Sequence, residues 1–176
     1  MLGAMYGATT GQSGRLMPHL ARMFPRAVDH VEHAARVGET GGQVCTRLGR
    51  WSPRPGPGWD AAQRGTGTAE GERRAAAMTR GRGRFTRNFV VQGTAAEWAV
   101  CWMGAVRSAL VREDLDAELV FFLHDEIVLH CAQEHAGRTA ELVRRCAEQA
   151  ARMVFGRIPV EFPVSVAVVE SYADAK

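Results

Sequence analysis

The sequence lacks any run of apolar residues long enough to cross a bilayer. A membrane-spanning helix needs about 18 or more consecutive, predominantly apolar residues, and polar or charged side chains interrupt every apolar stretch of this 176-residue chain before that length. The first residues, MLGAMYGATTGQSG, also lack the basic region and the continuous apolar region of a secretory signal. We therefore expect a cytoplasmic protein that has no membrane partner.

Cysteine and lysine are both scarce. The four cysteines are widely scattered and form no C-x-x-C pair, which favours reduced thiols over a disulfide framework. Lys176 is the only lysine among 22 basic residues. The glycine-rich stretch GATTGQSGR therefore lacks the Lys-Ser/Thr ending that a P-loop requires, and we exclude a P-loop here.

What the chain does have is enough apolar sequence for one core and an uneven distribution of charge. It is 46% hydrophobic and 23% charged, as is typical of a globular domain. Residues 1–110 hold 15 basic and 7 acidic side chains, a net charge of +8, whereas residues 111–176 hold 7 basic and 12 acidic, a net charge of −5. A basic half suggests a polyanionic partner, and an acidic half could concentrate divalent cations. The alternative is that the arginines only solvate exposed faces.

The pattern along the chain predicts an α+β fold, with helices packed on one face of an antiparallel sheet. Residues 52–83 are rich in Gly, Pro and Arg and predict a loop or an insertion. The stretch TAAE, residues 94–97, matches a capping box and predicts that a buried helix starts at Thr94. Two strands, ELVFFL and IVLHC, are expected next, then a helix over 133–155, and then one or two strands in IPVEFPVSVAVVE.

The stretch FFLHDEIVLH, residues 121–130, sets three ionisable side chains into an otherwise apolar run. The flanking strands predict an antiparallel β-hairpin with His124, Asp125 and Glu126 in its turn. Mg²⁺ takes oxygen ligands and is usually held by one or two protein carboxylates together with substrate phosphates. A rigid turn that bears two carboxylates is therefore a candidate metal platform for phosphoryl transfer. The alternative is a solvated turn that binds nothing.

A second cluster lies in RFTRNFVVQGTAAEW, where Arg84, Asn88 and Gln92 follow one another at intervals of four residues. If this segment is helical, the three side chains share one face. Their donors suit the minor groove of DNA, where the acceptors of A·T and T·A pairs look nearly alike. The alternatives are that the helix begins only at Thr94, or that the amides are ordinary polar groups near a helix end.

Together these segments resemble the C-terminal part of family A DNA polymerases, the DNA polymerase I type. That family shows an Asn-x-x-x-Gln-Gly-Thr-Ala-Ala helix followed by a His-Asp-Glu hairpin, and RNFVVQGTAAEW and LVFFLHDEIVL match both in order. The opening MLGAMYGATTG is similar to the end of the family's fingers helix, and FPVSVAVVESYADAK to its final strand and tail. The resemblance implies a palm-like sheet over residues 84–176 and a partial fingers segment over residues 1–51.

The resemblance also implies roles for single residues in template-directed DNA synthesis. Asp125 would be one of two aspartates that hold Mg²⁺ ions in a two-metal site, with Glu126 as a supporting carboxylate and His124 at the primer-terminal region. Tyr6 would lie at the base of the fingers helix, near the insertion site for deoxynucleoside triphosphates. A row of side chains would line the minor groove of the primer-template duplex: Arg84, Asn88 and Gln92.

The sequence departs from the family pattern in what it does not contain. No strand resembles the motif that supplies the first metal-binding aspartate, and the fingers cations that grip the nucleotide phosphates are also missing. We therefore expect the chain alone to lack polymerase turnover and to need the missing N-terminal part of the polymerase as its partner. The alternative is a non-catalytic nucleic-acid-binding remnant.

Overall fold

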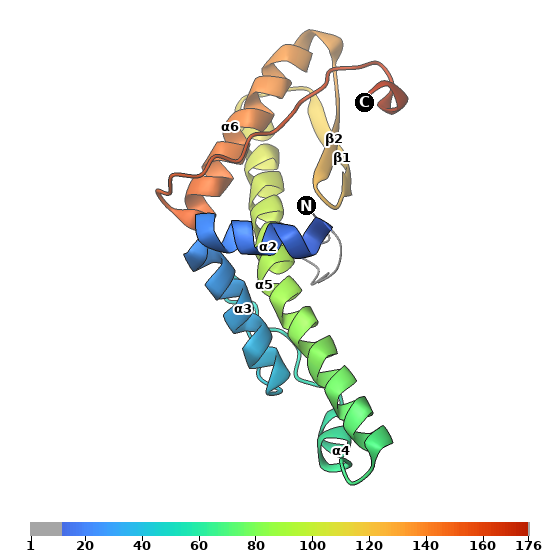
Figure 1. Ribbon diagram of the computed structural model, residues 1–176. Coiled ribbons are helices and arrows are strands. Elements are labelled where there is room, and N and C mark those ends of the chain that lie inside the picture. Colours follow the sequence, from blue (N-terminus) through green and yellow to red (C-terminus); the bar gives the residue numbers. More distant parts are fainter. Residues whose placement is uncertain (1–11, 176) are drawn as a thin grey trace. The chain divides into compact units, whose positions relative to one another are not determined.

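Helices account for most of the structure. The computed structural model describes residues 12–175 (Figure 1). The α-helices are α2 (Gln12–Met23), α3 (Pro25–Glu39), α4 (Gly58–Arg64), α5 (Ala69–Arg112) and α6 (Ala136–Phe155). The strands are β1 (Ala117–Leu123) and β2 (Glu126–Cys131), and short 3₁₀ turns cover Gln133–His135 and Tyr172–Asp174. The predicted α+β class, with an antiparallel sheet and mainly helices, is confirmed.

The chain divides into two compact units, Met1–Thr94 (unit 1) and Ala95–Lys176 (unit 2), and the division falls inside α5. This division does not coincide with the domain boundaries that we expected near residues 51 and 83. Helix α5 runs without interruption through residue 83. Although α5 has 44 residues, neither it nor any other described helix is long and apolar enough to cross a membrane.

Residues 52–83 were expected to form a loop or an insertion, and the loop is wrong because most of this stretch is helical. Residues 58–64 form α4, and α5 already begins at Ala69. The Ala- and Arg-rich stretch from residue 69 onward has strong helix propensity, which outweighs the cost of its glycines at about 1 kcal/mol each. Two acidic residues in the first turn, Glu70 and Glu72, also interact favourably with the helix dipole.

The helix start expected at Thr94 is also wrong, because Thr94 lies in the interior of α5. Its hydroxyl instead accepts a hydrogen bond from the Arg47 backbone N–H, at 3.1 Å. The threonine that caps α5 is Thr68, whose hydroxyl accepts a 3.1 Å hydrogen bond from the Gly71 N–H. A capping-box pattern is only a local signal, and here the helical residues that precede Thr94 override it.

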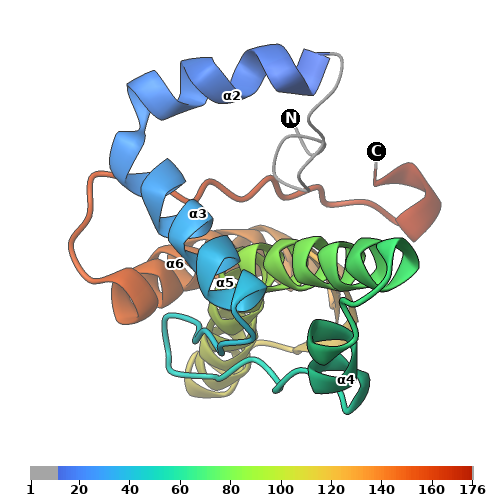
Figure 2. The same ribbon diagram turned by 60° about the horizontal axis from the view of Figure 1, so that its bottom comes forward.

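In unit 1, α3 packs against the N-terminal half of α5 (Figure 2). The closest approach is at Gly38, where a β-carbon would overlap the Thr86 hydroxyl and lie 2.8 Å from the Arg82 carbonyl oxygen. Thr86 is fully buried at this crossing. An ion pair of 2.7 Å between Arg87 and Glu32 joins the same two helices. Glycine at position 38 is therefore required by the spacing of the two helix backbones.

In unit 2, one face of α5 and one face of α6 form the core, with the hairpin and the C-terminal segment packed against it. The indole N–H of Trp102 donates a 3.0 Å hydrogen bond to the Val143 carbonyl, so the buried polar atom of this large side chain has a partner. The described core residues with the lowest exposure are Val106, Ala109, Leu142, Ala147 and Ala150.

The strands expected in residues 158–170 do not form, and this segment has no regular secondary structure. Pro159 and Pro163 have no N–H to donate to a sheet ladder, which is the physical reason. The segment packs on unit 2 through side chains instead. Phe162 stacks on Phe155 at 4.9 Å and on Trp98 at 5.7 Å between ring centroids.

The tight helix crossing predicts that Gly38→Ala destabilises unit 1. The added methyl group meets a buried hydroxyl and a backbone carbonyl, and overpacking of this kind costs about 1–3 kcal/mol. Urea unfolding followed by far-UV circular dichroism measures the change. Gly81→Ala is the matched control in the same unit, since its β-carbon meets nothing within 4 Å. That change should stabilise the helix by about 0.5–1 kcal/mol, so a shift of the same sign in both variants would contradict the prediction.

Candidate functional site

The row of polar side chains on α5 is helical throughout, so the alternative of a helix that starts only at Thr94 is excluded. Arg84, Asn88 and Gln92 succeed one another at four-residue intervals and lie along one side of unit 1's part of α5. Arg84 is exposed, whereas Asn88 and Gln92 are half-buried. Within the described residues, none of the three has a hydrogen-bond or ion-pair partner, so their donors are available to a ligand.

Two neighbouring arginines, Arg82 and Arg87, differ from Arg84 because their side chains bind other groups of unit 1. Arg87 is held by Glu32 at 2.7 Å. The Nη2 atom of Arg82 donates to the carbonyl oxygens of Gly42, at 3.2 Å, and Pro53, at 2.5 Å. In the arginine cluster from residue 73 to residue 87, these two side chains therefore stabilise unit 1.

Gly93, which follows the row, has a structural role. A β-carbon at this position would lie 2.5 Å from the Cγ2 atom of Thr46, a residue that is only 4% exposed. The glycine of the QGT stretch therefore lets the loop that carries Thr46 approach the helix next to Gln92. The hydrogen bond between Arg47 and Thr94 fixes the same loop.

The three ionisable residues of the second cluster lie at the tip of the hairpin in unit 2. β1 and β2 pair antiparallel, with Leu123 opposite Glu126, so the turn consists of His124 and Asp125, and Glu126 is the first residue of β2. The His124 and Asp125 side chains are 70% and 88% exposed, and His124 Nδ1 lies 3.5 Å from Asp125 Oδ1. The carboxylates are thus presented to solvent, which avoids the cost of burying them.

The turn holds His124 in the left-handed region, at φ 58°. Two-residue hairpin turns often need a positive φ to match the twist of the strands. Few residues other than glycine adopt this conformation, although histidine is among the more tolerant. Such backbone conformations cluster at functional turns, where the surrounding structure enforces them.

A β-bulge at Val120 changes which side chains of β1 face the core of unit 2. The pairing shifts between Leu119 and Phe121, so that Leu119 lies opposite Leu129 and Phe121 lies opposite Val128. Ile127 and Leu129 pack against the core. By strand alternation, Phe121, Leu123 and Glu126 point to the opposite face, where Phe121 is 49% and Leu123 57% exposed.

The donor set at the hairpin tip fits part of a metal site. Asp125 and Glu126 offer the hard oxygen ligands that Mg²⁺ takes. From residue 12 to residue 175, however, no group of three or more His, Cys, Asp or Glu side chains is placed to hold a metal ion. The hairpin could therefore contribute ligands to a shared site but not complete one. The predicted Tyr6 lies outside the residues that the structure describes.

Comparison with known proteins identifies the family. A model of DNA polymerase family A matches residues 2–174, nearly the whole chain. The chain belongs to this family. The resemblance of the QGTAA and HDE segments to this family is thereby confirmed. The roles that we assigned to single residues stay predictions.

Two relatives of this family A chain are much longer than it is. It is 31% identical to DNA polymerase I of Aquifex aeolicus (strain VF5) over 74 residues, which are 42% of this chain and 13% of the relative. Its fold is similar to the POL domain of Pol1 from M. smegmatis, solved in complex with DNA primer-template and dNTP, with a TM-score of 0.60 and 23% identity over 85% of this chain. The chain covers 26% of that structure.

One contact of the hairpin has no signal in the sequence. The Tyr172 phenol, in the tail of this family A chain, hydrogen-bonds to the Glu126 carboxylate, and this bond together with the negative charge of Glu126 raises the pKa of Tyr172 above its usual value. Forty-six positions separate the two residues in the sequence, and no motif links them. The C-terminal tail thus places Tyr172 close to Glu126, the last residue of the HDE segment.

The raised pKa predicts how the tyrosine titrates. In a Tyr6→Phe background Tyr172 is the sole tyrosine, and its ionisation should be delayed to a pH above the ordinary value of about 10. Because the folded state favours the neutral phenol, the contact stabilises the docked tail below pH 10 and is lost as pH rises through the folded pKa. Tyrosinate absorbance followed against pH measures this.

Glu126→Gln should return the tyrosine titration to its ordinary range, because it removes the negative charge. Glu118→Gln, in which an exposed glutamate of β1 changes in the same way, is the matched control and should leave the titration where it was. Equal titration curves for the parent chain and Glu126→Gln would contradict the contact.

Proposed function

We propose that this chain is the C-terminal part of a template-directed DNA polymerase and binds primer-template duplex DNA and deoxynucleoside triphosphates together with further polymerase sequence. Asp125 is the catalytic carboxylate that it contributes, Glu126 supports it, and His124 contacts the primer-terminal region. The observation that carries the proposal is the presence, in one family A chain, of an exposed carboxylate turn and of a row, Arg84, Asn88 and Gln92, whose side chains have no partner among the described residues.

The dimensions of the row suit the minor groove of a duplex. Residues 84 and 92 are eight positions apart on α5, a rise of about 12 Å along the helix axis. Base pairs follow one another at about 3.4 Å, so the row spans three to four of them. Its donors can reach acceptors that A·T and T·A pairs both present. Contact of this kind follows the shape of the duplex and does not read its sequence.

The hairpin carboxylates suit a shared metal site in a palm-like sheet. Mg²⁺ ions held here would supply charge stabilisation at the attacking and leaving oxygens of phosphoryl transfer. Asp125 and Glu126 would hold them from one side. The described residues place no third His, Cys, Asp or Glu side chain beside them to hold a metal ion, and we assign the second aspartate to further polymerase sequence.

The exposed face of the hairpin supports such a partner. A two-stranded sheet is marginally stable on its own, and the face turned away from the core of unit 2 presents Phe121 and Leu123 to solvent. Contiguous exposed apolar side chains commonly mark an interaction surface. The missing N-terminal part of the polymerase would cover this face and bring its aspartate beside Asp125.

A non-catalytic nucleic-acid-binding remnant is the second candidate. The lack of a complete cluster of metal ligands in the described part of the chain favours it, and the α5 row alone would account for duplex binding.

The row predicts salt-dependent duplex binding by the isolated chain. Arg84→Ala or Gln92→Ala should each weaken binding by about tenfold, the lower part of the range for a lost groove contact. Fluorescence anisotropy of a labelled duplex, at about 50 and 200 mM salt, measures affinity and its salt slope. Arg144→Ala, at an exposed arginine on α6, is the charge-matched control and should change affinity by less than about twofold. Equal losses in all three variants would argue against the row.

The incomplete metal site predicts that the purified chain alone does not extend a primer. One platform aspartate cannot hold two cations against their mutual repulsion, so dNTP incorporation should not exceed that of Asp125→Ala. Gel analysis of a labelled primer on a template measures this. Template-dependent extension that persists in Asp174→Ala, an exposed acid of the tail, and disappears in Asp125→Ala would refute the incomplete site.

A further inference from the structure

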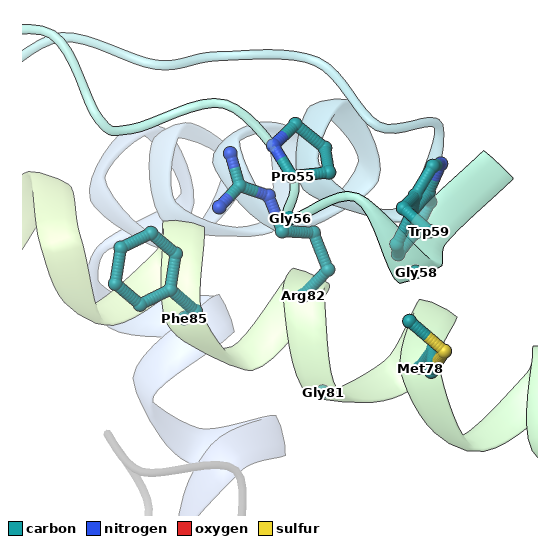
Figure 3. A pocket seen from close by; sticks show the side chains of 8 residues that line it. All are labelled: Pro55, Gly56, Gly58, Trp59, Met78, Gly81, Arg82 and Phe85. Carbon is teal, nitrogen blue, oxygen red and sulfur yellow. The ribbon is translucent and has the colours of Figure 1, made fainter.

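An open pocket of about 320 Å³ lies in unit 1 between α5 and the segment that leads into α4 (Figure 3). Its volume is at the lower end of the range for small-molecule sites, about 300–1,000 Å³. Trp59, Met78 and Phe85 supply large apolar walls. Pro55, Arg82 and three glycines also line the pocket. A β-carbon built on any of these glycines meets nothing within 4 Å, so the space above them is open: Gly56, Gly58 and Gly81.

The aromatic wall of Trp59 is well anchored. The side chain lies against the turn that ends α3, where a β-carbon on Gly41 would come within 2.9 Å of the indole Nε1. The Trp59 backbone N–H also donates to the Gly56 carbonyl at 2.9 Å. Because these contacts fix the ring, a ligand that stacks on it loses little of its binding energy to ordering the site.

Arg82 also lines the pocket and adds a positive charge to it. Figure 3 shows its side chain rising from α5 toward Pro55, with Phe85 on one side and Trp59 and Met78 on the other. The guanidinium lies 5.0 Å from the centre of the Phe85 ring, and its Nε atom is buried without a hydrogen-bond partner. Burial lowers the pKa of Arg82. No carboxylate of the described chain pairs with it, so the pocket combines flat rings with an uncompensated cation.

The surroundings of the pocket favour a polyanionic ligand. Residues 54–87 contain eight arginines and three acidic side chains. Among the described residues only one of these arginines, Arg87, forms an ion pair. Arg80 and Arg84 are exposed on α5 beside pocket residues Gly81 and Phe85. Two exposed positive charges therefore lie next to residues that line the pocket.

We propose that this pocket takes an unpaired base of single-stranded DNA, which stacks between Trp59 and the Arg82–Phe85 pair while exposed arginines contact the flanking phosphates. Stacking on aromatic rings in a basic groove is the usual way to bind single strands without reading sequence. Bases within a duplex are paired and stacked and cannot enter. The inference rests on the proposed function, because it assigns the unpaired strand of a primer-template a place beside the duplex-binding row.

The test separates the base from the phosphates. The affinities of the full chain for two labelled strands of about twelve nucleotides, oligothymidylate and an abasic strand with the same phosphates, are compared by fluorescence anisotropy. Oligothymidylate should bind about tenfold more tightly, as expected for one stacked base. Gly81→Leu puts a good helix former into the open space of the pocket, and Trp59→Ala removes its wall. Both should abolish the difference between the strands.

Gly104→Leu is the matched control. Gly104 also lies on α5 with open space around its β-carbon position, but in unit 2 and outside the pocket, so the preference for oligothymidylate should persist in this variant. Equal binding of both strands by the parent chain, or an unchanged preference in Gly81→Leu, would overturn the pocket assignment. Failure of the duplex-binding row is seen separately. Gln92→Ala tests the row on duplex DNA, whereas the preference for oligothymidylate compares two single strands with the same phosphates.

Discussion

The unbroken hydrogen-bonded backbone of α5 is the constraint on which the rest of the structure depends. Continuous helix from Ala69 to Arg112 fixes the angular position of every side chain along it. In unit 1 this register directs Thr86 toward α3, whereas Arg84, Asn88 and Gln92 meet no side-chain partner between residues 12 and 175. In unit 2 it directs Trp102 and Val106 into the core.

The arginines of unit 1 show how a basic composition is divided between folding and binding. Arg87 and Arg82 are used internally, one in an ion pair and the other in hydrogen bonds to backbone carbonyls. Arg84 and Arg80 remain exposed on the same helix. Net charge alone cannot make this distinction, because it depends on which helix face packs against α3 and against the loop before α4. The excess positive charge of unit 1 is thus available to a polyanion at specific positions.

Three secondary-structure predictions were wrong for the same reason. In each, the residues around a local signal decided the backbone conformation. Thr94 begins a perfect capping pattern, yet the helical residues before it continue and its hydroxyl serves a loop. The glycines of residues 69–83 indicate a loop, yet alanine, arginine and the Thr68 cap make the segment helical. Near the C-terminus the apolar alternation of a strand is present, but Pro159 and Pro163 cannot join a ladder.

The sequence by itself determined the α+β class, the family, and the spacing that puts Arg84, Asn88 and Gln92 on one helix face, because periodicity and motif order are properties of the chain alone. The tertiary structure decided which side chains distant in the sequence lie together and which stay exposed. It brought Tyr172 close to Glu126, placed Trp59 and Phe85 in the wall of one pocket, and left about half of the Phe121 side chain exposed. These outcomes depend on packing between residues distant in the sequence, and no local pattern encodes which distant side chain fills a given space.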